Sequence, residues 1–322
     1  LDNMVRRITT MLLAALTFIG AVAITPTASA QDGPHLVSTE RIDAQFLRIH
    51  VYSPAHNAVI PNDILVPEGN APRPTLYLLP GYYGGTDGLT WANTTDYRSF
   101  FRDKNVNVVS PIGGKGSLYS DWYQDDPVLG RNKWTTYLTQ ELPSVIDREF
   151  NGTGRDAIAG LSMSGGPALD IAAHNPGRFK AAATYSGCPM SSGVVGSPLA
   201  AGLVLGTGGN IGNAWGPPWD PAWADHDPNA QPTRLRDVAV FVGSASGVPG
   251  EVDGNHYNVG LWGGPLVVEG AANACSEHFT NNARAAGVNV DRFYAPNGAH
   301  TWPLFEHQLR TSWRTIAPAI GA

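Results

Sequence analysis

A serine flanked by small residues is the first candidate for chemistry in this sequence. Ser162 stands in the segment 160–166, GLSMSGG, after an apolar run at 156–159 that predicts a buried strand. The residues after Met163 predict a helix. A serine on a sharp turn between strand and helix is a nucleophile elbow, in which the hydroxyl stands clear of the sheet beside free helix N–H groups. The pattern G-x-S-x-G is matched except at its last position, Ser164, so the segment predicts a serine nucleophile.

A serine hydroxyl needs a base, and histidine is the usual one. In α/β hydrolases the order along the chain is serine, acid, histidine, and the histidine lies in a loop after the last strand. His300 is the histidine in that position, directly after the predicted strand 290–294. His307 is expected on the face of the closing helix, and His174 at the far end of the helix that follows Ser162. We therefore expect His300 to be the base.

Spacing alone leaves the acid open. It should follow the predicted strand 238–242, and Glu251, Asp253 and Glu269 all do so. Those that are not the acid are expected to be solvated loop charges. His256 lies near Glu251 and Asp253, but the spacing fits no strong metal-binding motif, and we expect no metal.

Two backbone N–H groups should hold the oxyanion that develops when the serine attacks an ester. One is expected from Met163, the residue after the nucleophile. The other is expected from the glycine-rich loop 80–85, where the Tyr82 amide is favoured because Gly81 leaves room. A turn without this function would contain the same residues.

The elements that must position these groups alternate between strand and helix. Apolar runs predict strands at 75–79, 106–110, 156–159, 181–186, 238–243 and 290–294, and alternation predicts a half-buried edge strand at 45–52. Helices are predicted at 97–103, at 133–150, after residue 163, in the later part of 267–286 and at 303–316. The order predicts an α/β fold, with a mostly parallel central sheet and helices on both faces.

The stretch 188–236 breaks this alternation and is rich in Gly, Pro and Trp. Trp215, Trp219 and Trp223 are four residues apart, but the prolines between them oppose one continuous helix. We expect an ordered excursion over the active site, either as the wall of an apolar groove or as a packed loop.

Composition restricts the class of protein. The chain has 322 residues, of which 43% are hydrophobic and 15% charged, which is enough to bury a large core. Its formal net charge of −6 argues against nucleic-acid binding, which needs a basic surface. Since no repeat or linker divides the rest of the chain, residues 31–322 are predicted to form a single domain.

The N-terminal residues 1–30 predict a secretory signal peptide. Arg6 and Arg7 precede an apolar run at 11–24, and Ala28-Ser29-Ala30 supplies a cleavage site. The run is short for a membrane span, so the mature chain is expected to lack one and to be secreted, either extracellular or associated with the cell envelope. The two cysteines of an exported chain suggest one disulfide, with two separate buried thiols as the alternative.

Several blocks of sequence resemble one family. They are LYLL at 76–79, SDWYQ at 120–124, the segment 133–143, GLSMSGG at 160–166, and Asn297-Gly298 with His300 and Trp302. Together they resemble the secreted mycolyltransferases of mycolic-acid-bearing actinobacteria, the antigen 85 type and its corynebacterial relatives, over nearly the whole mature chain. The resemblance implies an α/β-hydrolase fold that tolerates a small residue such as Ser164 at the end of the elbow.

The resemblance also implies which carboxylate is the acid. The family's glutamate precedes the histidine at the start of a helix, and Glu269 in the segment VVEGA has that position. We further predict a disulfide that ties this helix to the core, because Cys188 follows the predicted strand 181–186 and Cys275 lies two turns beyond Glu269.

The activity implied is acyl transfer from a trehalose mycolate to a sugar in the cell envelope. Ser162 would attack the ester, His300 would take its proton and Glu269 would hold the imidazole, with no cofactor. The partners would be a glycolipid acyl donor and a sugar acceptor, trehalose mycolate or arabinogalactan-like, and no nucleic acid. The alternatives are a secreted carboxylesterase that uses water as acceptor and a non-catalytic surface antigen.

The sequence departs from the antigen 85 type at the oxyanion loop. That type has an acidic residue and an arginine there, used for trehalose, whereas Pro80 and Tyr83 stand at the matching positions. Losing a charge and a fork-shaped donor is not conservative, so the acceptor is expected to differ. The predicted substrate contacts are Tyr83, Thr301 and Trp302.

Overall fold

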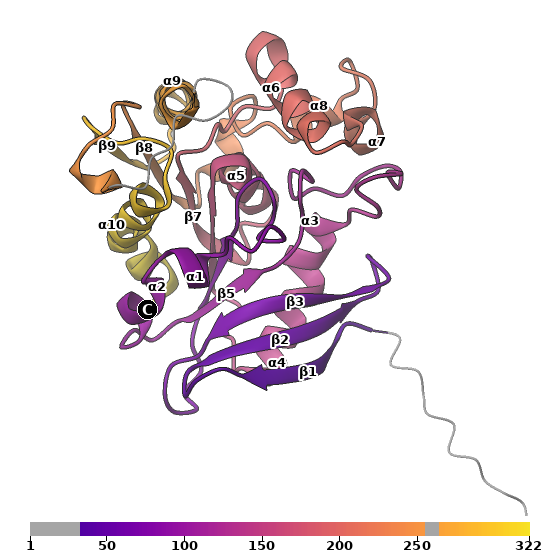
Figure 1. The fold of residues 1–322 in the computed structure, drawn as a ribbon, viewed down its shortest axis with the longest axis vertical. Coiled ribbons are helices and arrows are strands. Elements are labelled where there is room, and N and C mark those ends of the chain that lie inside the picture. Colours follow the sequence, from indigo (N-terminus) through magenta and orange to yellow (C-terminus); the bar gives the residue numbers. More distant parts are fainter. Residues whose placement is uncertain (1–32, 255–263) are drawn as a thin grey trace, which may run out of the picture. The chain divides into compact units, whose positions relative to one another are not determined.

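The computed structural model describes residues 33–254 and 264–322, and the predicted signal peptide and His256 lie outside them. Within the described residues, a nine-stranded sheet has the order β1-β2-β3-β5-β4-β6-β7-β8-β9 (Figure 1). Its strands are β1 (His35–Arg41), β2 (Phe46–Ser53), β3 (Ala58–Leu65), β4 (Thr75–Leu79), β5 (Asn107–Pro111), β6 (Asp156–Leu161), β7 (Phe179–Tyr185), β8 (Ala239–Ala245) and β9 (Val290–Ala295). Pairing is antiparallel from β1 to β5 and parallel from β5 to β9, which confirms the predicted mostly parallel sheet.

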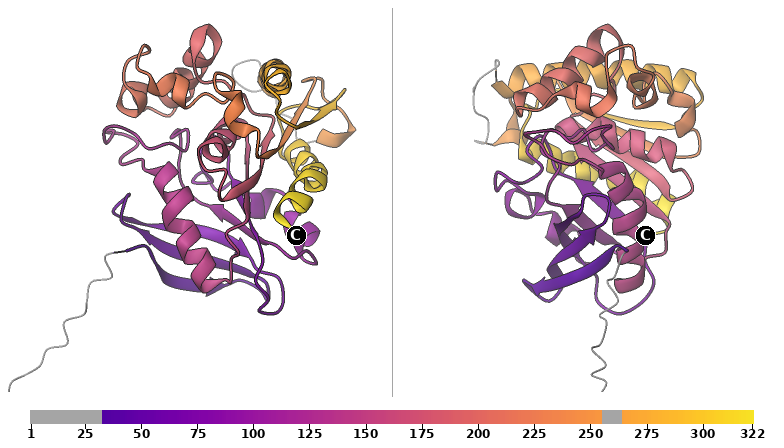
Figure 2. Two further views of the ribbon diagram at one scale, coloured as in Figure 1. Left: turned by 180° about the vertical axis from the view of Figure 1, so that it is seen from behind. Right: turned by 90° about the vertical axis from the view of Figure 1, so that its right-hand side faces the viewer.

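Helices cover both faces of this sheet, as predicted (Figure 2). They are α1 (Trp91–Thr94), α2 (Tyr97–Phe101), α3 (Trp134–Thr136), α4 (Leu142–Glu149), α5 (Gly165–His174), α6 (Gly193–Gly206), α7 (Ile211–Trp215), α8 (Ala222–Asp225), α9 (Gly264–Ala285) and α10 (Trp302–Ile320). A π-helical turn, η1 (Tyr137–Glu141), joins α3 to α4, so the predicted helix 133–150 is one continuous feature. Short 3₁₀ turns are η2 (Ser162–Ser164), η3 (Pro232–Leu235) and η4 (Glu251–Asp253).

The period of two along β4 builds a separate core on each face of the sheet. Tyr77 and Leu79 pack in the core shared with α4, α5 and α9. Leu76 and Leu78 pack in the core shared with α1, α2 and α10. All five residues of β4 are buried, as expected for a central parallel strand. The two cores fix the carboxyl ends of the parallel strands, where the candidate site lies.

Two local predictions are wrong. The segment 45–52 was expected at the edge of the sheet, but β1 pairs with β2 and takes that place. β1 carries polar residues and is mostly exposed, so it lacks the apolar signal that would reveal it. Helix α9 begins at Gly264 rather than in the later part of 267–286. In its first turns the apolar side chains of Val267 and Val268 are exposed. The sequence of these turns therefore lacks the pattern of buried apolar and exposed polar residues that predicts a helix.

The excursion 188–236 forms α6, α7, α8 and η3 rather than one continuous helix, as the prolines predicted. Trp215 and Trp223 are buried against each other, edge to face, with ring centroids 5.4 Å apart. Trp219 between them is exposed. Two of the three tryptophans are therefore packed inside the excursion, and the third is exposed to solvent.

Candidate active site

The turn after β6 has the geometry of a nucleophile elbow. Ser162 has a φ of +52°, in the left-handed region that a non-glycine residue rarely adopts. A Cβ at Gly160 would lie 2.3 Å from the carbonyl oxygen of Ser164, so the close approach of strand and turn requires glycine there. The Ser164 side chain is buried and its hydroxyl donates to the Leu161 carbonyl at 2.9 Å. A serine therefore fits at the position where the usual pattern has glycine.

The structure brings the three predicted side chains together in one hydrogen-bonded series. His300 lies in the loop between β9 and α10, and its Nε2 is 2.8 Å from Ser162 Oγ. Its Nδ1 is 2.8 Å from Oε2 of Glu269, which is fully buried on α9. When Nδ1 carries the proton, it donates to the carboxylate and Nε2 accepts from the serine hydroxyl. This arrangement can move a proton from the hydroxyl to the imidazole.

The second oxygen of Glu269 is held by groups that sequence reasoning missed. Its Oε1 accepts from Ser186 Oγ at 2.8 Å and from the Ala245 amide at 2.7 Å. Ser186 in turn accepts from Gln308 Nε2 at 2.8 Å, across from α10. Both carboxylate oxygens are thus hydrogen-bonded, as a buried charge requires. Ser186 has a φ of +51°, a strained backbone that no sequence pattern reveals.

The other two candidate acids do not reach the imidazole. Glu251 is exposed on η4. Asp253 is fully buried, but its carboxylate accepts from the Ala299 amide at 3.0 Å and from Thr301 Oγ1 at 2.7 Å. It therefore faces the residues on either side of His300 rather than the ring.

The loop after β4 lies beside the nucleophile. A Cβ at Gly81 would lie 2.7 Å from Leu161 Cδ1 and 3.8 Å from Ser162 Cβ. Outside the helices and strands of residues 33–254 and 264–322, the Tyr82 amide donates to no backbone acceptor. Tyr82 follows Gly81 in this loop and Met163 follows Ser162 in η2, so both predicted oxyanion donors are adjacent in the chain to residues at the elbow.

The predicted substrate contacts have different surroundings. Tyr83 is 45% exposed and packs edge-on against Tyr82, with ring centroids 4.9 Å apart. Trp302 is half-buried and packs edge to face on Trp91 at 5.4 Å. Thr301 is buried and its hydroxyl is bonded to Asp253, which gives it a structural position instead of the predicted substrate contact.

The predicted disulfide is confirmed. Cys188 and Cys275 are joined, with Sγ atoms 2.05 Å apart. Cys188 follows β7, and Cys275 lies on α9 beyond Glu269. The bond therefore ties α9, which carries Glu269, to the loop after β7. Ser186 lies in the same loop, directly after the last residue of β7, Tyr185.

A second group of titratable side chains joins α5 to the excursion. Asp170 Oδ1 lies 3.1 Å from His174 Nδ1, and its Oδ2 lies 2.8 Å from Nδ1 of His226, which follows α8. The hydrogen bond to Asp170 raises the pKa of His174 to about 9. His226 also stacks on Trp215, with centroids 5.0 Å apart. Through its contacts with Asp170 and Trp215, His226 holds α7 and α8 against α5, the helix that follows Ser162.

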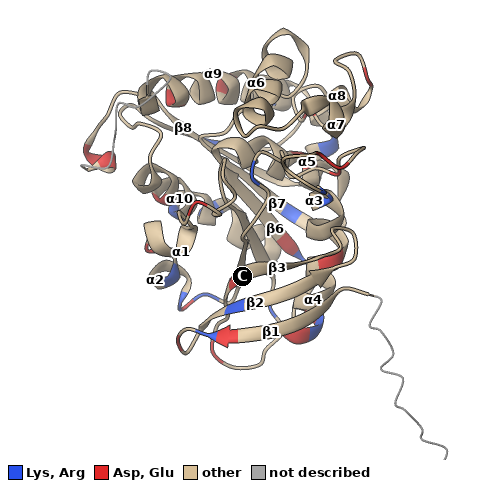
Figure 3. Cartoon of the chain, turned by 45° about the vertical axis from the view of Figure 1, so that its right-hand side comes forward, with Lys and Arg blue, Asp and Glu red and all other residues tan. Residues whose placement is uncertain are grey.

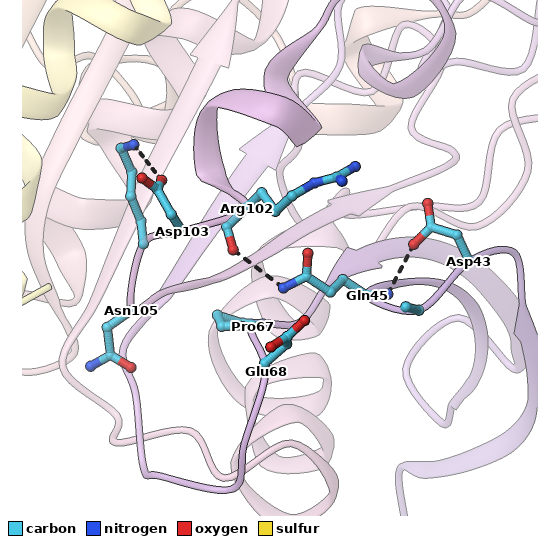
Figure 4. A pocket seen from close by; sticks show the side chains of 9 residues that line it. Asp43, Gln45, Pro67, Glu68, Arg102, Asp103 and Asn105 are labelled. Atoms are coloured by element: carbon cyan, nitrogen blue, oxygen red, sulfur yellow. Dashed lines mark hydrogen bonds and ion pairs between the residues drawn. The ribbon is translucent and has the colours of Figure 1, made fainter.

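One cavity lies away from this site. It has a volume of about 610 Å³ and polar lining that includes Asp43, Glu68, Arg102 and Asp103 (Figure 4). These residues precede β4 and β5 or lie beside the start of β2, whereas Ser162 follows the carboxyl end of β6. Among the described residues there is no cluster of His, Cys, Asp and Glu suited to a metal ion. None of the helices in that part of the chain is long and apolar enough to span a membrane.

Comparisons with known proteins agree on one group. A family model described as "Putative esterase" matches residues 53–316. The diacylglycerol acyltransferase/mycolyltransferase Ag85C of Mycobacterium leprae is 33% identical over 311 residues, which cover 93% of this chain and 86% of the relative. Ag85B of Mycolicibacterium smegmatis is 33% identical, with 98% of this chain and 96% of the relative covered.

Solved structures extend the likeness. MPT51 (FbpC1) of Mycobacterium tuberculosis superposes with a TM-score of 0.74 at 26% identity, covering 86% of this chain and all of that one. An S-formylglutathione hydrolase from Agrobacterium tumefaciens has a TM-score of 0.65 at 17% identity, covering 89% of this chain and 100% of that one, and supports the fold alone.

Proposed function

Because the chain belongs to the antigen 85 mycolyltransferase family of esterase-like α/β hydrolases, we propose that it is a serine acyltransferase. It moves a mycolyl or similar long-chain acyl group from a trehalose ester to a sugar hydroxyl. The observation that carries the proposal is the hydrogen-bonded series of Ser162, His300 and Glu269 at a nucleophile elbow.

In the first half of the reaction, Ser162 Oγ attacks the ester carbonyl and its proton passes to His300 Nε2. The carboxylate of Glu269 stabilises the imidazolium that forms. The Tyr82 and Met163 amides hold the negative oxygen, and each such donor is worth about 3 kcal/mol in the transition state. Collapse of the intermediate breaks the ester C–O bond, and His300 returns its proton to the departing sugar oxygen.

The second half repeats these steps with a different nucleophile. A sugar hydroxyl gives its proton to His300 and attacks the acyl-serine, and the serine oxygen leaves and recovers that proton. The exposed Tyr83 and the half-buried Trp302 are the side chains proposed to contact substrate. No cofactor takes part in either half.

The proposed location is the cell envelope or the medium outside the cell. Residues 1–30 would direct export and be removed after Ala30. The Cys188–Cys275 disulfide supports this location, because disulfides persist in oxidising compartments.

A carboxylesterase is the second candidate function. It is favoured by the esterase family match and by Pro80 and Tyr83, which stand where the antigen 85 type has an acidic residue and an arginine. Water would then take the place of the sugar hydroxyl in the second half of the reaction.

Product partition distinguishes the two candidates. The enzyme is given a short-chain ester together with a large excess of trehalose or of an arabinose oligomer, and acyl sugar and free acid are measured. The transferase proposal expects acyl sugar to grow with sugar concentration, and free acid alone at high sugar would contradict it. Mass spectrometry of the intact protein should show an acyl adduct that is absent in Ser162→Ala; an adduct elsewhere, or none, would contradict the acyl-serine.

The choice of acid is tested by a matched pair of variants. Glu269→Gln should lower kcat by about 100-fold or more, because the imidazolium loses its charged partner. Glu251→Gln changes an exposed carboxylate nearby and should leave kcat unchanged. The reverse result would assign the role to Glu251.

A further inference from the structure

Helix α6 is apolar around its whole circumference. Its sequence is GVVGSPLAAGLVLG, with Ser197 as its polar side chain. It lies within residues 181–219, which contain no Asp, Glu, Lys, Arg or His. A helix with apolar residues on every side is normally buried in a core or in lipid. Figure 3 shows α6 in a single colour, without a charged residue along its length.

Most of this helix is nevertheless exposed. Its buried residues are Gly196, Ala200 and Val204. Val194 is 95% exposed, Leu205 72% and Val195 55%. Val128, 65% exposed, lies beside the end of α6, since its Cγ1 would be 3.2 Å from a Cβ at Gly208. We call the side chains of Val128, Val194, Val195 and Leu205 the α6 surface.

The α6 surface is continuous with the proposed active site. A Cβ at Gly206 would lie 2.3 Å from the hydroxyl of Tyr82, so the last turn of α6 rests on this ring. The amide of Tyr82 is one of the two proposed oxyanion donors. A layer that covers the C-terminal end of α6, at Leu205, therefore lies beside the loop that carries this proposed donor.

We propose that the α6 surface docks on a lipid layer, so that the acyl ester passes to Ser162 directly from lipid. The proposal rests on the function proposed above. A protein partner would normally meet a polar or charged rim. Residues 181–219 carry no charge, and the charges that flank Val128, Asp125 and Arg131, pair with each other at 3.1 Å. A lipid layer needs only apolar side chains at its boundary. Because the chain is acidic and α6 carries no charge, we expect docking to need no anionic lipid and to depend little on salt.

The test is co-sedimentation with phosphatidylcholine vesicles at low and high sodium chloride. We expect the wild type to sediment with the vesicles equally at both salt concentrations. The double variant Val194→Asp/Leu205→Asp should lower the bound-to-free ratio by about tenfold or more, because two exposed apolar anchors become charged. The control is Val37→Asp, an exposed valine on β1, which should behave as the wild type.

Activity separates this proposal from the function on which it rests. The double variant should hydrolyse a water-soluble butyrate ester at the wild-type rate and lose rate on an ester embedded in vesicles. No turnover of either ester by the wild type would contradict the proposed function, while sedimentation would still test docking. The docking proposal is overturned if the wild type does not sediment, if the double variant sediments equally well, or if the variant abolishes a dimer seen by light scattering without changing sedimentation.

A different observation carries a second inference, about Asp253. Its buried carboxylate accepts from the Gly250 amide at 2.8 Å, the Ala299 amide at 3.0 Å and Thr301 Oγ1 at 2.7 Å. It thus binds the residues immediately before and after His300. We infer that Asp253 is a positioning residue, which holds the loop so that the imidazole meets both Ser162 and Glu269.

The variant Asp253→Asn tests this role. It replaces one accepting carboxylate oxygen by an NH₂ group, which would face the amide and hydroxyl groups that now donate to Asp253. We expect kcat to fall by about 10- to 100-fold with KM within about twofold, since a small displacement of the base slows only the chemical step. The downfield proton resonance of His300 Nδ1–H should also shift or broaden. Thr301→Val removes one of the three donors and should have a smaller effect. An unchanged resonance and kcat, measured in folded protein, would overturn the inference.

Discussion

The disulfide between Cys188 and Cys275 allows a quantitative prediction. It closes a loop with a sequence separation of 87. In the chain-entropy account, a loop of that length stabilises the native state by about 4.6 kcal/mol at 25 °C. The double variant Cys188→Ser/Cys275→Ser should therefore lose most of that free energy of unfolding. For a chain of this size, the loss corresponds to a fall in Tm of about 8 °C.

The same variant should keep its catalytic geometry. Cys275 shares α9 with Glu269, but the carboxylate is held separately by Ser186 and the Ala245 amide. We therefore expect kcat of the folded variant to stay within about threefold of the wild type, because these hydrogen bonds survive the substitution. Stability and activity would then respond to the disulfide by very different factors.

Thermal and urea unfolding followed by circular dichroism measure the stability, and steady-state hydrolysis below the transition measures kcat. Dithiothreitol is the internal control, since it should lower the Tm of the wild type by the same amount and leave the double variant unchanged. A fall of less than about 2 °C would refute the loop-entropy reasoning, which expects several times more. A large loss of kcat in folded protein would show that the disulfide, and not the hydrogen bonds, positions Glu269.

Three further substitutions test individual contacts. Ser186→Ala removes one donor to Glu269 and should lower kcat by about tenfold with KM unchanged; equal kcat would mean that the Ala245 amide suffices. Ser162→Gly should be about 1 kcal/mol more stable to urea than Ser162→Ala, because glycine alone relaxes at a φ of +52°; equal midpoints would argue against backbone strain. The pKa of His174 is raised to about 9 by Asp170, so its contribution to stability is complete below about pH 6.5 and disappears as the pH rises through about 9. Urea midpoints should fall across that window in the wild type and not in His174→Gln, and parallel curves would contradict the assignment.

The sequence indicated the candidate nucleophile and the candidate base, because both predictions depend on local pattern and chain order. Ser162 lies between a predicted strand and a predicted helix, and His300 follows the last strand. The acid could not be chosen in this way, since Asp253 and Glu269 both follow β8 and both are buried. They differ in what their oxygens face, which is a tertiary property, and only a family resemblance indicated Glu269.

Other parts of the site had no sequence signal at all. Ser186 looks like the end of an apolar strand, and Gln308 like one polar residue among several in an amphipathic helix. They become significant when α10 packs against β7 and their side chains meet. Sequence reasoning missed β1 for a different reason. This strand is mostly exposed, and its pairing with β2 is what holds it in the sheet. Patterns of burial cannot reveal a strand that buries little.

The two adjacent tyrosines of the loop after β4 have different proposed roles. At Tyr82 the proposed contribution is a backbone N–H, which any residue except proline would supply. At Tyr83 the proposed contribution is the side chain, which is 45% exposed and packs edge-on against Tyr82. On the proposed function, substitutions at position 83 would alter which hydroxyl compound is recognised and would leave the backbone donor at position 82 in place. The proposed acceptor specificity could then change during evolution through single substitutions at one exposed side chain.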